Sequence, residues 1–272
     1  DYTVALDANG NASISVQDID NGSYDNCSLT LSLDKLTFDC SNVGDNTVTL
    51  SGVDASGNAA TATATVTVVD DILPTFTASD FTGDLDEEGE LTISEQQIVD
   101  QLSDNCGIAS VNISQTEFSC GNLGDNSVTI TVTDNSGNTV SETVTITVED
   151  NIAPTVVTKN ITKMVNSATP VTITPQDVLV LNCGSTGISM PQPVPGMGDE
   201  EIAFEANCTS DNCTIVSYSL SKTSFTCNDA GQNVVTVTVT DQSGNATTAT
   251  AIVTVVDNTL PTARTKTANI YL

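Results

Sequence analysis

Histidine and tryptophan are absent from this 272-residue chain, and basic side chains are scarce. Six Lys and Arg stand against 35 Asp and Glu, which gives a formal net charge of -29. Nucleic acids and anionic membrane surfaces bind clustered cations, so neither is an expected partner. No apolar run approaches the length of a membrane span, so membrane insertion of this segment is not expected. Without histidine the usual acid–base and triad schemes lack their central group, and we expect no catalytic residue and no enzymatic activity.

Aromatic residues make up only 4% of the chain, so a single large core would be poorly filled. Several small modules, each with a valine- and isoleucine-rich core and a covalent crosslink, fit this composition better. Eight cysteines, an even number, predict disulfides and an oxidising, extracellular setting. Zinc is not expected, because the chain has no Cys-x-x-Cys pair and no histidine. The chain starts without Met and shows no signal peptide, and we expect it to be a piece of a longer protein.

Internal repetition divides the chain into three copies of one unit. Each copy carries, in the same order, Asp-Asn-Cys, Phe-x-Cys, Asp-x-Ser-Gly-Asn, a further Asp and Pro-Thr. In chain order these markers begin at Asp25, Asp104 and Asp211; at Phe38, Phe118 and Phe225; at Asp54, Asp134 and Asp241; at Asp70, Asp150 and Asp257; and at Pro74, Pro154 and Pro261. The last markers are 80 and then 107 residues apart, so the third copy contains 27 additional residues. Register is lost between Asp177 and Asp211, which places the insertion at about 178–210.

The segments between these markers predict strands. Residues 65–68, 144–148 and 252–256 alternate Val or Ile with residues such as Thr, which is typical of a strand with one buried and one wet face. Asp-x-Ser-Gly-Asn stands between two such runs and is interpreted as a hairpin turn. Asp7–Gly10 and Asp86–Gly89 mark an earlier hairpin in the first two copies. We predict an all-β fold of tandem immunoglobulin-like antiparallel β-sandwich modules in an extended array.

The markers also set the predicted domain boundaries and disulfides. The modules are residues 1–73, truncated at the start; 74–153; 154–260 with the insertion; and 261–272, the first strand of a following module. Cysteine spacing predicts one bridge in each module and one that closes the insertion: Cys27–Cys40, Cys106–Cys120, Cys213–Cys227 and Cys183–Cys208. A bridge between modules would contradict this strictly modular interpretation. The insertion is interpreted as a clamp on its own module, or alternatively as a contact loop for a partner.

The combined motifs resemble a known family of repeats. The run Asp18–Cys27, reading Asp-Ile-Asp-Asn-Gly-Ser-Tyr-Asp-Asn-Cys, is followed by Phe-x-Cys, Asp-x-Ser-Gly-Asn and Val-x-Asp-Asn-x-x-Pro. This string resembles the hyalin-repeat-like modules of Bacteroidota surface proteins, most closely the repeats of the giant mobile adhesin of gliding flavobacteria. The resemblance covers the whole chain, although the third copy lacks the Asp-x-Asp-Asn-Gly-Ser run. It implies export by the type IX secretion system, an extracellular, outer-membrane-associated location, and a role in cell-surface filaments, attachment and gliding motility.

Calcium is the cofactor that the recurring carboxylates predict, because Ca²⁺ takes about six to eight oxygen ligands from closely spaced loops. In this topology the Asp-Asn-Cys loop and the Asp-x-Ser-Gly-Asn hairpin should share one pole, which also receives the terminal Asp of the preceding module. The predicted ligands at the two junctions are Asp70, Asp71, Asp104 and Asp134, and then Asp150, Asn151, Asp211 and Asp241. The candidates in the first module are Asp18, Asp20 and Asp25 on one loop and Asp54 in the hairpin. Turn capping by these side chains is the alternative interpretation.

Three functions are compatible with this sequence. The first is the repetitive stalk of a large secreted surface adhesin with calcium-rigidified junctions, whose partners are neighbouring modules and extracellular polysaccharide or other surfaces. The second is a set of spacer modules in a type IX-exported enzyme, and the third is a ligand-binding fragment of a surface receptor. Marker registration at both ends favours a long array and therefore the first.

Overall fold

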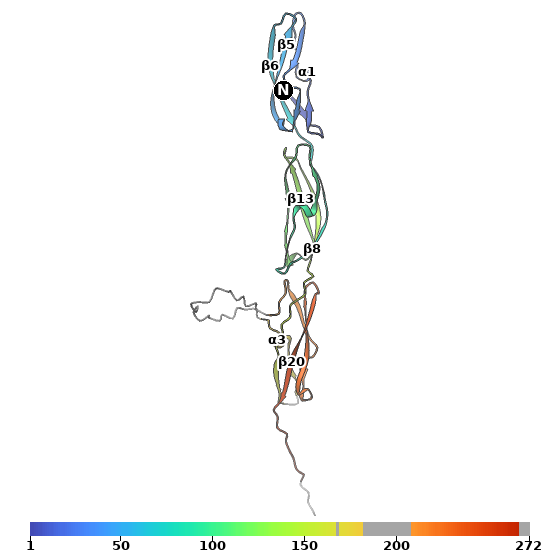
Figure 1. Ribbon diagram of the computed structural model, residues 1–272, viewed down its shortest axis with the longest axis vertical. Helices are drawn as coiled ribbons and strands as arrows, with labels where there is room; N and C mark the ends of the chain where they lie inside the picture. Colours follow the sequence, from blue (N-terminus) through green and yellow to red (C-terminus); the bar gives the residue numbers. More distant parts are fainter. Residues whose placement is uncertain (167–168, 182–207, 267–272) are drawn as a thin grey trace, which may run out of the picture. The chain divides into compact units, whose positions relative to one another are not determined.

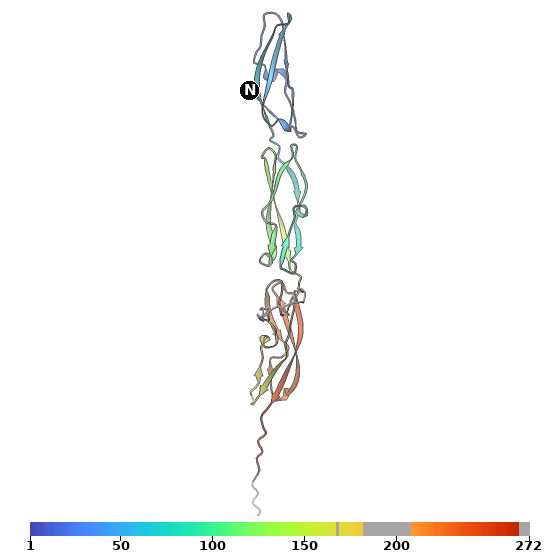
Figure 2. The same ribbon diagram turned by 60° about the vertical axis from the view of Figure 1, so that its left-hand side comes forward.

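The computed structural model describes residues 1–166, 169–181 and 208–266, and Figures 1 and 2 show it from two sides. By compactness the chain divides into two units. The first unit comprises Asp1–Gly83, Thr92–Phe118 and Asn122–Val148, and the second comprises Asp84–Leu91, Ser119–Gly121 and Glu149–Leu272. The first unit therefore holds the first β-sandwich with most of the second, and the second unit holds the remainder. No helix in the described ranges is long and apolar enough to cross a membrane.

The first sandwich consists of a four-stranded sheet in the order β1-β6-β5-β3 and a two-stranded sheet of β2 and β4. Its elements are β1 (Tyr2–Ala5), β2 (Asn11–Ser13), α1 (Val16–Ile19), β3 (Leu29–Leu33), β4 (Thr37–Asp39), the 3-10 helix η1 (Cys40–Asn42), β5 (Gly44–Asp54) and β6 (Ala59–Val69). The long hairpin of β5 and β6 forms the centre of the larger sheet (Figure 1).

The second sandwich repeats this arrangement and adds one strand pair. Its sheets have the orders β11-β13-β14-β8, β12-β9 and β10-β7. The elements are β7 (Thr75–Ala78), β8 (Phe81–Asp84), β9 (Glu90–Thr92), α2 (Glu95–Ile98), β10 (Val99–Ser103), β11 (Ile108–Ile113), β12 (Glu117–Ser119), η2 (Cys120–Asn122), β13 (Gly124–Asp134) and β14 (Thr139–Glu149). β7 pairs antiparallel with β10 and opens at the Pro-Thr marker of this copy.

The third sandwich has sheets in the orders β15-β20-β19-β17 and β16-β18. Its described elements are β15 (Ile161–Val165), β16 (Val171–Thr172), α3 (Pro175–Val178), β17 (Ile215–Leu220), β18 (Ser224–Phe225), η3 (Cys227–Asp229), β19 (Gly231–Asp241) and β20 (Ala246–Asp257). Thr155 pairs with Ser210 and Thr158 with Leu179, so the described ends of the predicted insertion lie beside this segment. The rest of the insertion, 182–207, lies outside the described residues, and with it both interpretations of the insertion.

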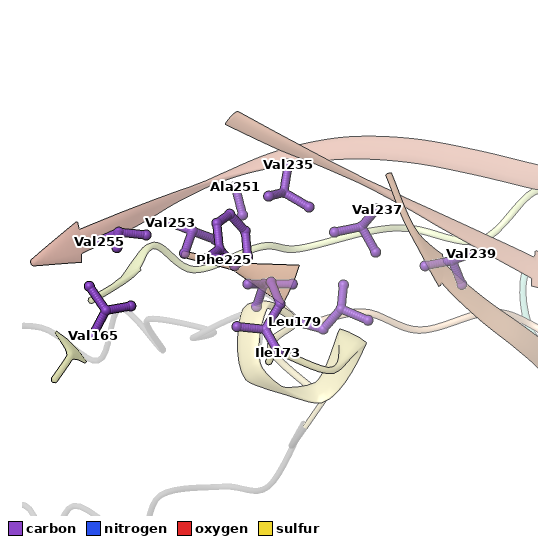
Figure 3. Close-up of a cluster of buried hydrophobic side chains, with 11 residues drawn as sticks. Val165, Ile173, Leu179, Phe225, Val235, Val237, Val239, Ala251, Val253 and Val255 are labelled. Atoms are coloured by element: carbon purple, nitrogen blue, oxygen red, sulfur yellow. The ribbon is translucent and has the colours of Figure 1, made fainter. Parts of the chain in front are cut away.

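Alternating side chains build each core, as the period-two pattern predicts. In β13, Val128, Ile130 and Val132 are buried, while Thr129 between them faces solvent. In the third sandwich, Phe225 lies between the valines of β19 and β20 and the side chains contributed by the segment around α3 (Figure 3). Each core is small, and a single large-to-small substitution such as Phe to Ala at a fully buried position typically costs about 3–5 kcal/mol.

The all-β sandwich fold is confirmed, with two differences in detail. The first strand of a module pairs in parallel with the last one, as β1 does with β6 and β15 with β20, so the larger sheets are mixed. The turns at Asp7–Gly10 and Asp86–Gly89 do not close hairpins, because β1 pairs with β6 whereas β2 pairs with β4 in the other sheet. Both differences follow from the chain crossing between sheets at this turn, which strand periodicity does not reveal.

The predicted disulfides within modules are wrong. Cys40 bonds Cys106 and Cys120 bonds Cys213, with Cα–Cα distances of 5.3 and 5.5 Å, whereas Cys27 is free. This overturns the pairs Cys27–Cys40, Cys106–Cys120 and Cys213–Cys227, and the last of these leaves Cys227 free as well. The pair Cys183–Cys208 cannot be followed, because Cys183 lies outside the described residues. The bridges join neighbouring modules, yet each module keeps its own sheets and core.

Strand length explains the error. Cys120 directly precedes the start of β13, whereas Cys106 lies near the end of β13, since Ile108 pairs with Asp134. The eleven residues of β13 extend over about 35 Å at roughly 3.3 Å per residue. A disulfide needs Cα atoms within about 7 Å, so the two cysteines of one module cannot bond. Each cysteine instead meets a cysteine of the adjacent module at the same pole.

Candidate cation sites at the two joints

Three carboxylates converge where one module meets the next. We call Asp70, Asp104, Asp134 and their surroundings the first joint; every residue of it belongs to the first compact unit. One carboxylate oxygen from each of the three lies within 4.8 Å of the others. Asp70 and Asp134 are buried, with 6% and 1% of their surface exposed. Burying like charges this close is unfavourable unless a cation or protons compensate them.

Three different elements bring these carboxylates together. Asp70 directly follows β6, Asp104 opens the Asp-Asn-Cys loop before β11, and Asp134 ends β13. The Asp104 Oδ2 atom accepts a hydrogen bond from the N–H of Cys106 at 2.8 Å, which turns the loop toward the joint. Loop and hairpin share one pole because the start of β11 pairs with the end of β13. The disulfide Cys40–Cys106 fixes the same pole covalently to the preceding module.

The Asp-x-Ser-Gly-Asn hairpin also holds the incoming linker. Ser136 Oγ donates to Asp70 Oδ2 at 2.8 Å. Asn138 Nδ2 donates to the carbonyl oxygens of Asp70 and Ile72, and also to Asp134 Oδ2. The motif therefore recognises the backbone and the carboxylate of the preceding module, beyond its role as a turn.

The second joint, built from Asp150, Asp211 and Asp241 within the second compact unit, repeats these contacts. Ser243 Oγ donates to Asp150 Oδ2 at 3.1 Å, and Asn245 Nδ2 donates to the Asp150 carbonyl oxygen at 2.8 Å. The Cys120–Cys213 disulfide occupies the position of Cys40–Cys106. A second occurrence of the same arrangement shows that it belongs to the repeat.

An asparagine completes each joint. Asn105 Nδ2 donates to Asp70 Oδ1 at 3.1 Å and to the Asp7 carbonyl oxygen at 3.2 Å. Asn212 makes the equivalent bonds to Asp150 and Asp86, at 3.2 and 3.1 Å. These amides hold the loop of one module against the early turn of the module before it.

Glycine is required in that early turn. A Cβ on Gly10 would lie 2.6 Å from the Sγ atom of Cys40 and 2.9 Å from the carbonyl oxygen of Asn105. A Cβ on Gly89 would come equally close to Cys120 and Asn212, at 2.9 and 2.7 Å. Both glycines also have positive φ, so the turn and the close approach depend on the absence of a side chain.

Buried oxygens without hydrogen-bond partners mark both joints. They are the Oδ1 atoms of Asp104, Asn105, Asp211 and Asn212. An unpaired buried polar atom costs about 1–3 kcal/mol, and a charged one costs more. The same two atoms are unpaired at each joint, next to the same three carboxylates. Oxygen atoms in this state are suited to coordinate a hard cation.

The electrostatics point the same way at the second joint. Burial is the largest cause that raises the pKa of Asp211; the hydrogen bond from Cys213 N–H opposes it, and the charges of Asp241 and Asp150 raise it further. At the first joint, burial acts to raise the pKa of Asp134, but hydrogen bonds from its own hairpin outweigh burial and lower it. Asp134 is thus held as a carboxylate, whereas ionised Asp211 is destabilised by its neighbours.

The other predicted ligands do not join a carboxylate cluster in the described residues. Asp18 caps α1 through Ser15, and Asp20 accepts from Ser23 N–H. Asp25 and Asp54 bond backbone groups of their own loops, at Cys27 and at Ser56 and Asn58 respectively. Asp71 is exposed beside the first joint, and Asn151 donates to Asp84 and Glu149.

Several residues of the joints were not predicted from the sequence as site residues. They are Asn105, Asn212, Ser136, Ser243, Asn138, Asn245, Gly10 and Gly89. Recurrence was the available signal, because the serines and asparagines occupy fixed places in the motifs that repeat.

No protein-family model and no curated protein sequence matches the chain. Solved structures that match it include mouse cadherin-23 EC22-24, at 14% identity and TM-score 0.30, covering 94% of this chain and 95% of that one. Drosophila N-cadherin EC1-4 matches at 12% identity and TM-score 0.31, covering 93% and 72%. Protocadherin GammaB4 matches at 15% identity and TM-score 0.31, and this chain spans about half of it, 48%. These values are too low to assign the function or the ligands of the cadherins to this chain.

Proposed function

We propose that this chain is a structural repeat segment of an extracellular adhesion protein, in which calcium and disulfides fix each module to the next. The observation that carries the proposal is the repeated carboxylate triad with an unpaired Asp Oδ1 and an unpaired Asn Oδ1 beside it. The joints link modules that have separate cores, so a cation there acts on the stiffness of the array. An array of this kind holds an adhesive part of a protein away from the cell.

Calcium fits these joints better than other cations. Three carboxylates and an amide oxygen supply part of the roughly six to eight oxygen ligands that Ca²⁺ takes in irregular geometry, and Mg²⁺ demands a stricter octahedron. Zinc prefers His and Cys ligands, but the chain has no histidine and the joint cysteines form disulfides. When bound, calcium would neutralise the mutual repulsion of the carboxylates.

The setting of the proposed protein follows from its bridges and motifs. Disulfides between modules persist in oxidising compartments, which supports an extracellular location. The resemblance to hyalin-repeat-like modules extends the proposal to a cell-surface filament that is exported by type IX secretion, attached at the outer membrane and used in gliding. A type IX signal at the C-terminal end of the parent gene, together with loss of attachment and gliding on deleting that gene, is the expected result; a gene without either overturns this extension.

Calcium titration calorimetry on chelator-treated chain tests the cation sites. We expect two sites per chain, with dissociation constants of about 10⁻⁴–10⁻³ M, which is typical of extracellular modules. Asp104→Asn and Asp211→Asn should each remove one site, and the double variant should remove both. Asp71→Asn is the matched control, because it removes the same charge from an exposed position beside the first joint. Absence of saturable calcium binding, or equal loss in the control, would contradict the proposal.

A further inference from the structure

We propose that the Cys27 end of the first module and the Cys227 end of the third are two halves of one further joint. A second copy of this chain docks head to tail through them, and a Cys27–Cys227 disulfide closes the contact. The inference goes beyond calcium binding, because it assigns a self-complementary interaction surface that acts between molecules.

Each internal joint has an acceptor half and a donor half. The acceptor half is the Asp-Asn-Cys loop with the Asp-x-Ser-Gly-Asn hairpin, and it contributes Cys106 or Cys213. The donor half is the Phe-x-Cys cysteine, the terminal Asp and the linker after it, and it contributes Cys40 or Cys120. The same pairing of unlike halves occurs twice, so the rule of association is visible within one chain.

The first module presents a complete acceptor half. Cys27 is free and exposed, in the position that Cys106 and Cys213 occupy in their modules. Its N–H donates to Asp25 Oδ2 at 2.8 Å, as the N–H of Cys106 does to Asp104 Oδ2. The hairpin below it has the same internal bonds as the occupied ones, with Asp54 Oδ1 accepting from two backbone N–H groups at 2.8 Å. This pole is therefore arranged as a joint before a partner binds.

A groove beside this pole lacks the strand that fills it in the second module. There β10 pairs with β7, but none of the described residues pairs as a strand with 20–24, the counterpart of β10. Residues of this stretch line a groove of about 480 Å³ whose other wall includes Leu29, Leu31 and Gly52. Tyr24 at its edge is 93% exposed. The groove has the shape and lining to receive an extended segment.

The third module presents the donor half, including such a segment. Cys227 is free and exposed at the start of η3, the place of Cys40 before η1. Asp257 is exposed, and its Oδ1 accepts from Thr259 N–H at 2.8 Å, just as Asp70 Oδ1 accepts from Ile72 N–H. The Pro-Thr pair that opens β7 recurs at 261–262, so residues 261–266 are the counterpart of the strand that the groove receives.

One departure weakens the non-covalent part of this contact. Thr169 stands in the third module where Gly10 and Gly89 stand in the others. A side chain at this place approaches the Asn carbonyl oxygen of the docked loop to about 2.7–2.9 Å in the internal joints. We therefore expect a transient encounter that the disulfide makes permanent, and the test uses the covalent product.

Closure requires an oxidant, for which a small-molecule disulfide such as oxidised glutathione suffices. One thiolate attacks the small disulfide and expels a thiol; the second thiolate then attacks the mixed disulfide and expels the other. Two protein thiols are oxidised to one disulfide, and one small disulfide is reduced to two thiols. An unlike pairing of this kind does not close on itself and generates linear chains of molecules.

Two single variants of the full chain separate specific docking from random oxidation. Cys27→Ser keeps only the donor thiol, and Cys227→Ser keeps only the acceptor thiol. After incubation in a glutathione redox buffer, we expect each variant alone to stay largely monomeric. The mixture, with one variant mass-labelled, should form a heterodimer in about tenfold excess over either homodimer. Peptide mapping should identify Cys27–Cys227, and the unmutated chain should give a ladder of multimers.

Homodimers as abundant as the heterodimer would overturn the proposal, and so would the absence of dimers. Ending the chain after Leu260 tests the groove: heterodimer formation should slow several-fold, and an unchanged rate would overturn that part. Parallel series in calcium and in chelator keep the two proposals apart. A heterodimer excess in both series supports docking whatever the calorimetry shows. No excess in either sinks docking and leaves the calcium titration to stand alone.

Discussion

Asp104→Asn should change the stability of the first joint in opposite directions with and without calcium. The substitution keeps the shape of the side chain and an oxygen that can accept from Cys106 N–H, but it removes one charge of the triad. In chelator the loss of repulsion should stabilise the folded chain. In calcium the loss of a ligand should destabilise it. A residue that only caps a turn would give the same sign in both conditions.

The structure sets the size of each effect. Two unit charges at the 4.8 Å limit of the triad interact with about 3.5 kcal/mol at an effective dielectric constant near 20, which is an upper bound. With solvent screening we expect the variant to gain about 1–3 kcal/mol in chelator. Calcium at a hundred times its dissociation constant stabilises a site by about 2.7 kcal/mol. For units of this size that corresponds to a rise in Tm of about 5–10 °C in the unmutated chain.

Scanning calorimetry in chelator and in calcium measures both signs. The second joint is intact in this variant and serves as an internal reference for calcium loading. Asp71→Asn is the external control and should leave the calcium-induced rise in Tm unchanged. Destabilisation of equal size in both conditions, or a control that behaves like Asp104→Asn, would refute a cation-binding triad.

Three further substitutions test the rest of the joint and one module. Gly10→Ala should destabilise the first joint by about 1–3 kcal/mol more than Gly57→Ala, as judged by thermal melts, because both glycines have positive φ but only the former faces a close neighbour; equal costs would contradict the close packing. Replacing both Cys40 and Cys106 with Ser should cost about 4 kcal/mol by the chain-entropy estimate for a separation of 66 residues, measured by urea unfolding; an unchanged midpoint would show that the bridge constrains nothing. Asp177→Ala should cost the third module about 1 kcal/mol at neutral pH: its capping-box hydrogen bond first, and then its lysine partner, lower its pKa, so its contribution is present above pH 4 and is lost as pH falls through the lowered value; a cost independent of pH in acid titrations would contradict this origin.

The sequence carried the sandwich and the position of the carboxylates well, because both depend on local patterns. Alternating Val and Thr define which face of β13 is buried, and the repeated motifs mark the same pole in each copy. Asp70, Asp104 and Asp134 meet for this reason, although they are separated by up to 64 residues in the chain.

The pairing of the cysteines could not be obtained in the same way. Spacing along the chain suggested that Cys106 and Cys120 were neighbours, but a long strand separates the poles at which they lie. Which cysteine of the adjacent module each one meets depends on how two modules dock. That contact is made by the turn at Gly10 and the amide of Asn105, neither of which has a periodic signature of its own.

A crystal structure of the chain grown in millimolar calcium tests the central claim most directly. The account predicts one ion at each joint, bound by Asp70, Asp104 and Asp134 at the first and by Asp150, Asp211 and Asp241 at the second, with oxygen distances of about 2.3–2.6 Å. The Oδ1 atoms of Asp104 and Asp211, which have no hydrogen-bond partner, should be among the ligands. Joints with both disulfides formed and water alone between the carboxylates would contradict it.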